Sequence, residues 1–220
     1  MKNFRLIFLQ QILLEFRERS SIAGVALYLL STVLIIYFTF SLRQNLINTA
    51  VWSALFWIAA LFTAINAVGK SFLTESRGKS IYYFSLVSAH QLIMARMAYN
   101  AILCFLLFIM SYVLFSLIIF NPVVHTVMFL ITLLLAATGF ASSLTLVSGI
   151  AARATNSHVL MAILSFPVII SVLLLAIRIT RNCVEGLDTS LNYPDLGILL
   201  AINMISVTIS YLLFPYIWRS

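Results

Sequence analysis

The sequence has 220 residues, of which 63% are hydrophobic and 9% charged, and its formal net charge is +7. Soluble domains carry about a quarter charged residues and about half apolar ones, so this composition and a mean hydropathy of +1.10 exclude a soluble globular fold. The composition predicts an integral membrane protein. The excess of Lys and Arg then indicates topology rather than binding to nucleic acid.

The first segment, residues 1–19, forms helix readily but is too charged to cross a membrane. Its charged residues cover a broad arc when the segment is drawn as a helix. This pattern favours an interfacial helix that lies on the inner leaflet and enters the first span at an elbow. A charged tail that only directs topology is the alternative interpretation.

Six long apolar runs follow, bounded by charged residues or, in the longest run, divided by the turn-forming pair Asn121-Pro122. Each run holds the roughly 20 residues that a helix needs to cross the hydrocarbon layer, and none alternates as a barrel strand would. The predicted fold is all-α, a single transmembrane domain over residues 1–220. Its predicted spans are residues 21–42, 50–69, 97–120, 124–151, 158–178 and 196–217.

The distribution of positive charge predicts the orientation. Ten of the thirteen Lys and Arg residues lie at the two termini or in the connections that share their side of the membrane. Cytoplasmic flanks retain positive charge, so both termini and residues 70–96 are predicted to be cytoplasmic. The longest connection on the opposite face is expected over residues 179–195.

A possible nucleotide-binding motif occurs where the second span ends. Gly-Lys-Ser, the triplet that closes a P-loop, begins at Gly69 and again at Gly78. A P-loop also needs a glycine five residues earlier, and Ala64 and Leu73 stand at those positions. The preceding residues are also a continuous apolar run rather than a strand. The triplets therefore do not predict nucleotide binding by this chain.

The segment 70–96 is instead predicted to be a docking surface. It combines charged residues with an apolar second half, too polar for a span and too apolar for a free loop. A short helix against the membrane face fits this pattern, with Glu75, Arg77 and Lys79 available to a cytoplasmic partner. A solvated loop held by lipid headgroups is the alternative.

Few side chains within the spans could do chemistry. Arg153 and Arg178 are the only charged residues expected in them, both at span edges, which argues against a proton-coupled carrier or an ion pump. The histidines are isolated, so no metal or cofactor site is predicted. His125 could bind one face of an external cofactor, but interfacial hydrogen bonding explains it more simply. Asn66 and Asn203 are expected to be helix-packing contacts.

Other residues are expected to be structural. No catalytic motif occurs, so the chain is predicted not to be an enzyme, and ATP hydrolysis is expected on a separate chain. Cys104 and Cys183 are expected at different depths, Cys183 in the outer connection, and no disulfide is predicted. Trp52 and Trp218 lie at span ends, where belt tryptophans occur.

Three stretches together resemble one protein family. They are the amino-terminal "LLEFRERSS", the exit of the second span "WIAALFTAINAVGKSFLTESRGKSIYYFSLVSA", and "GFASSLTLVSGIAARATNSHVLMAILSFPVIISVLLL". The whole chain resembles the CcmB family, the permease subunit of the ABC transporter of cytochrome c maturation, within the ABC-2 permease class. The family's acidic residue and glycine after the second span match Glu75 and Gly78. Departures at Ala89, Thr155 and Ser171 concern local helix geometry.

The resemblance implies a function in a complex. Partners would be a CcmA-like ATPase, CcmC-like and CcmD-like membrane subunits, the haem chaperone CcmE indirectly, and a second copy of the chain as a further candidate. The complex would use ATP for haem export or for release of the haem-loaded chaperone, in the bacterial inner membrane. Glu75, Arg77, Gly78 and Lys79 would couple this chain to the ATPase. An ABC-2 exporter of lipid-linked sugars or drugs, and a membrane enzyme or scaffold, are the alternatives.

Overall fold

The computed structural model describes residues 8, 19–40, 48–68, 88–151 and 157–219. These residues form helices and connections, with no strand among them. The elements are α2 (Arg19–Phe40), α3 (Thr49–Val68), α5 (Ala89–Ile118), α6 (Thr126–Ala151), α7 (Ser157–Glu185), the 3-10 helix η2 (Thr189–Asn192) and α8 (Tyr193–Arg219). Six helices are long and apolar enough to cross a membrane, which confirms an all-helical fold with six candidate spans.

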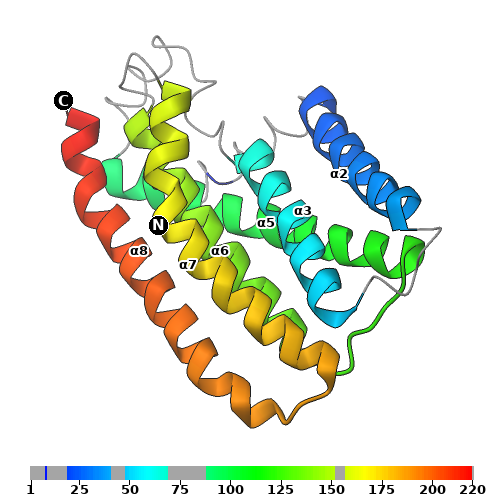
Figure 1. The fold of residues 1–220 in the computed structure, drawn as a ribbon. Coiled ribbons are helices and arrows are strands. Elements are labelled where there is room, and N and C mark those ends of the chain that lie inside the picture. The colour runs from blue at the N-terminus through cyan, green and yellow to red at the C-terminus, as the bar shows by residue number, and fades with distance from the viewer. Residues whose placement is uncertain (1–7, 9–18, 41–47, 69–87, 152–156, 220) are drawn as a thin grey trace.

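The helices form a bundle with two ends (Figure 1). We call one the short-loop end, because the connections 119–125 and 186–192 lie there, where α5 and α7 finish and α6 and α8 begin. We call the opposite end the Arg96 end, where α5 begins. The positive-charge pattern predicts that the short-loop end is the outer one.

Helix α6 is the centre of the bundle. It is the most buried of the candidate spans, whereas α2 and α8 are the least buried. Figure 1 shows α6, α7 and α8 side by side, α5 crossing them obliquely, and α2 at the margin beside α3. Gly139 and the small residues Ala141, Ser142 and Ser143 are all buried, which lets neighbouring helices approach α6 closely.

An aromatic cluster fills the core between α3, α5 and α6. Trp52 and Phe56 stack with ring centroids 5.5 Å apart, and the Trp52 Nε1–H donates to the carbonyl oxygen of Phe120 at 3.2 Å. Trp52 is completely buried, so the expectation of a lipid-facing belt residue is wrong. The members of this aromatic cluster are Trp52, Phe56, Trp57, Phe108, Phe115, Phe129 and Phe140.

Two helices extend beyond their predicted spans and continue through charged residues. Helix α5 begins at Ala89, so residues 89–96 are its first turns rather than part of a separate short helix. Nothing in "AHQLIMAR" breaks a helix, and Leu92 and Ile93 are buried there. Helix α7 continues past Arg178 to Glu185 and stops at Gly186, whose φ of 67° is a left-handed conformation that glycine adopts freely.

The predicted elbow helix lies outside the described residues except at Phe8 and at Arg19, which begins α2. The ring of Phe8 meets that of Tyr99 on α5 edge-on, with centroids 6.4 Å apart. The interfacial helix over residues 1–19 stays a prediction.

Candidate functional site

The predicted coupling residues are Glu75, Arg77, Gly78 and Lys79, and all four lie outside the described residues. What the structure describes is the place where the segment joins the bundle. Helix α5 follows it directly, with Ser88 in extended backbone as its N-cap. Helix α5 is therefore the described element that follows the predicted coupling residues in the chain.

The first turns of α5 pack against the last turns of α8. Leu92, Ile93, Ala95 and Met97 form a small core with Phe214, separate from the main core of the bundle. The His90 ring lies 4.4 Å from that of Tyr211, centroid to centroid. These contacts join the start of α5 to the end of α8 at the Arg96 end.

Arg96 is a charged residue that the sequence interpretation placed in a cytoplasmic flank. In the structure it is 1% exposed, on the second turn of α5 beside this small core. The sequence interpretation treated each charge as a span boundary and did not predict this burial. A helix of 30 residues has room for an arginine within its length, and the uninterrupted helical pattern from residue 89 was the signal that could have found it.

Polar side chains also join helices inside the bundle. On α6, Thr145 Oγ1 donates to the Ala141 carbonyl and accepts from Asn100 Nδ2 of α5 at 2.8 Å. Trp57 Nε1–H donates to Thr180 Oγ1, joining α3 to α7 at 2.9 Å. These side chains are buried, so the hydrogen bonds satisfy polar groups that would otherwise be costly away from water.

Asn203 of α8 forms a third such contact, to α6, which confirms its predicted packing function. Asn66 is exposed on α3, so the same expectation is wrong for that residue. Asn203 faces a neighbouring helix and Asn66 does not. This difference depends on the packing between helices rather than on local sequence.

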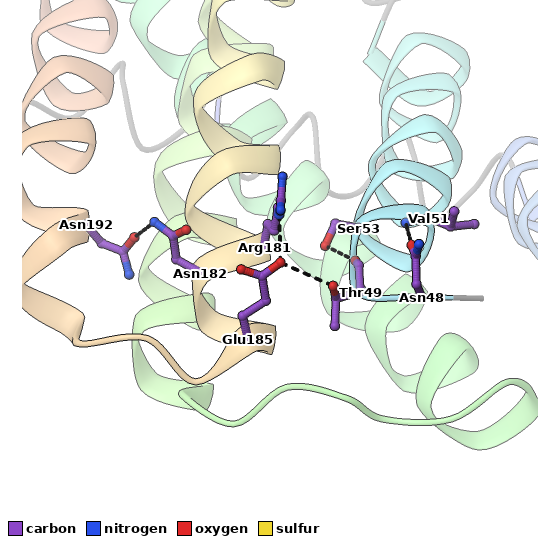
Figure 2. Close-up of polar contacts among 8 residues, drawn as sticks. All are labelled: Asn48, Thr49, Val51, Ser53, Arg181, Asn182, Glu185 and Asn192. Atoms are coloured by element: carbon purple, nitrogen blue, oxygen red, sulfur yellow. Dashed lines mark hydrogen bonds and ion pairs between the residues drawn. The ribbon is translucent and has the colours of Figure 1, made fainter. Parts of the chain in front are cut away.

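A polar network joins three helices at the short-loop end (Figure 2). Arg181 Nε donates to Glu185 Oε1 at 2.7 Å, and the same oxygen accepts from Thr49 Oγ1 of α3 at 3.3 Å. Asn182 Nδ2 donates to Asn192 Oδ1 at 2.7 Å, joining α7 to η2. The residues predicted as a 179–195 connection are therefore largely helical and tied to their neighbours.

One ion pair of this end was missed from the sequence. Arg178 Nε lies 3.2 Å from Asp195 Oδ2, joining α7 to α8. The carboxylate side chain is 8% exposed and the arginine side chain 71%. The predicted last span starts at residue 196, whereas α8 begins at Tyr193 and includes Asp195, whose side chain is buried.

Backbone bonds hold the two short connections together. The carbonyl oxygen of Cys183 accepts from the backbone N–H groups of Val124 and His125, at 3.1 and 3.2 Å. Cys183 is buried in α7, not in a loop, and both it and Cys104 are free thiols. The His125 Nε2 atom is buried without a hydrogen-bond partner, so this nitrogen is not open to an external cofactor.

The described residues contain no cluster of metal-binding side chains. Over residues 19–40, 48–68, 88–151 and 157–219, no group of three or more His, Cys, Asp or Glu side chains could hold a metal ion. The polar contacts described above join helices to one another.

Comparison with known proteins identifies the family. The family model described as CcmB protein matches residues 2–218. A search of curated proteins finds no match. Because the matched region covers nearly the whole chain, the chain belongs to the CcmB family, the permease subunits of the ABC transporter of cytochrome c maturation.

Proposed function

We propose that this CcmB-family chain couples ATP hydrolysis on a CcmA-like partner to haem export or to release of the haem-loaded chaperone CcmE. The observation that carries the proposal is the family match over residues 2–218, together with six candidate spans. Family membership implies an ABC transporter with an ATPase and further membrane subunits. In the proposed complex those subunits are CcmC-like and CcmD-like, and this chain itself is not catalytic.

The proposed coupling path runs from residues 70–88 into α5. Helix α5 is one uninterrupted helix of 30 residues that follows this segment directly. A displacement at its first turn is carried along a rigid helix to the short-loop end, because each turn is hydrogen-bonded to the next. The contacts of Phe214 and Tyr211 would carry the same displacement to α8.

The proposed orientation places the Arg96 end in the cytoplasm and the protein in the bacterial inner membrane. Cysteines introduced at Asn45 and Thr189 should react with a membrane-impermeant maleimide added outside the cell, and one at Ser80 should not. Labelling at Ser80 from outside would reverse the orientation and remove the basis for docking of a cytoplasmic ATPase.

Deletion of the chain tests the pathway. Cells that lack it should lose their holo c-type cytochromes, measured by haem staining, and regain them when the wild-type chain is supplied. Unchanged c-type cytochromes, with loss of another exported compound, would favour the ABC-2 exporter alternative.

Substitution at Glu75 tests the coupling residues. Glu75→Ala and Glu75→Gln should leave membrane insertion intact, because Lys and Arg set topology, but lower the amount of ATPase that co-purifies. Glu185→Gln is a matched control, since this acid is exposed at the opposite end and its contacts are within the chain. Equal ATPase recovery from the Glu75 variants and wild type would remove Glu75 from the proposed site.

A further inference from the structure

Helix α8 is fastened to α6 by one polar side chain in the middle of the bundle. Asn203 Nδ2 donates to the carbonyl oxygen of Leu135 at 2.8 Å and to Thr138 Oγ1 at 2.9 Å. The Thr138 hydroxyl in turn donates to the same carbonyl at 2.8 Å. One amide group therefore meets two polar groups of α6 that are bonded to each other.

The hydrogen bonds fix which way the amide points. A carbonyl oxygen only accepts, so the nitrogen of Asn203, and not its oxygen, faces Leu135. The oxygen Oδ1 is then left buried and without a hydrogen-bond partner, on a residue that is 7% exposed. Buried acceptors are rarely left in this condition, since the lost solvation is not compensated.

Gly139 makes this contact possible. A Cβ added at Gly139 would lie 2.5 Å from Asn203 Oδ1, closer than real Cβ contacts, and 3.1 Å from Val172 Cγ2 of α7. Only a residue without a side chain lets α6, α7 and α8 meet here. Gly197 of α8 differs from Gly139, because a Cβ added there would have nothing within 4 Å.

We propose that Asn203 is a reversible latch between α8 and α6. The structure has the latched arrangement, in which Nδ2 holds Leu135 and Thr138 while Oδ1 has no partner. In the released arrangement α8 moves away from α6, the two hydrogen bonds break, and water or a neighbouring hydroxyl donates to Oδ1.

Two observations favour a latch over a permanent joint. A permanent contact between these helices would be best served by apolar packing, whereas this one leaves a polar atom unsatisfied and so keeps a second arrangement close in free energy. Helix α8 is also among the least buried spans, so much of its surface faces away from the bundle. Helix α8 also contacts the start of α5 through Phe214 and Tyr211, which would link the latch to the coupling path. The use of the latch in transport rests on the proposed function.

Distance measurement between spin labels tests the latch without the partner subunits. Labels attached at Leu134→Cys of α6 and Met204→Cys of α8 stand on exposed positions next to the latch, and the native cysteines are buried. In the purified full chain in lipid nanodiscs, the wild-type background should give mainly the shorter distance. Asn203→Ala should move at least half of the population to a longer one, whereas Gly197→Ala should leave the distribution unchanged.

A combined substitution separates the latch from general damage. Gly139→Ala should lengthen the distance while Asn203 is present, because the new methyl collides with Oδ1, and should add little to Asn203→Ala, where that oxygen is gone. Full additivity of the two substitutions, or an unchanged distance in Asn203→Ala, would overturn the latch.

The coupling function is measured separately in the assembled complex with its ATPase. There, a non-hydrolysable ATP analogue should shift the wild-type distance by changing the latched fraction. If the isolated chain behaves as proposed and the complex does not respond to nucleotide, the reversible use of the latch is wrong. If the distance responds to the nucleotide but cells that lack the chain keep their c-type cytochromes, the proposed pathway is contradicted and the latch is not.

Discussion

The two ends of the bundle are held together by different kinds of contact. At the short-loop end, directional hydrogen bonds and an ion pair join α7 to α3, η2 and α8, among them Thr49–Glu185 and Arg178–Asp195. Among the described residues of the Arg96 end, α5 and α8 meet through apolar and aromatic contacts around Phe214 and Tyr211. Directional bonds fail when groups shift by about an ångström, whereas apolar contacts tolerate sliding. We therefore expect the short-loop end to be the fixed end and the contact of α5 with α8 to be the adaptable one.

The largest effect is expected in the aromatic cluster that supports the fixed end. Phe56→Ala should lower the free energy of unfolding by about 3–5 kcal/mol, because it removes a completely buried ring that touches four others. An SDS unfolding titration in mixed micelles measures the change. Phe62→Ala on the same helix is the control, since Phe62 is 48% exposed, and a similar loss there would mean that the cluster is not special.

The adaptable end should tolerate the equivalent change better. Phe214→Ala should cost about 3 kcal/mol, the lower limit for a buried phenylalanine, because its small core can close around the space. The same titration measures it, with Leu213→Ala as the neighbouring exposed control. A cost well above that of Phe56→Ala would reverse the comparison between the two ends.

The ion pair between α7 and α8 should respond asymmetrically. Arg178→Ala leaves a buried carboxylate without its partner and should cost about 1–3 kcal/mol. Asp195→Asn leaves an arginine that is already mostly exposed and should cost about 0–1 kcal/mol. The SDS titration measures the cost of each single variant. Equal costs would contradict an effect of the difference in burial between the two side chains.

The smallest effect is expected where the network is exposed. Arg181→Ala should change the free energy of unfolding by less than about 1 kcal/mol, because water and salt screen this pair. The difference from wild type should shrink further between low and high ionic strength. A loss that persists in high salt would contradict the screening of this pair.

Sequence reasoning predicted the helices well because their evidence is local. Long apolar runs bounded by charges or by Asn121-Pro122 gave all six candidate spans, and small residues identified the buried face of α6. The family resemblance was confirmed by the match over residues 2–218.

The errors came from contacts between helices. Arg96 and Asp195 were read as boundaries, although each lies within a helix and is buried, one beside the Phe214 core and one against Arg178. Local charge cannot show that a neighbouring helix provides a partner. The same limit applies to Asn203, whose packing function was predicted but whose hydrogen-bond partners and unpaired oxygen depend on the approach of α6 at Gly139.

The length of α5 makes this subunit sensitive to the thickness of its bilayer. A helix of 30 residues is about 45 Å long, and a typical hydrocarbon layer is about 30 Å thick, so α5 matches the layer only when it is inclined. Figure 1 shows that α5 is inclined to α6, α7 and α8. Lipids with longer acyl chains would draw α5 upright and shift its first turn, together with Phe214 beside it. Under the proposed orientation, bilayer thickness would therefore act on the same end of the bundle that faces the ATPase.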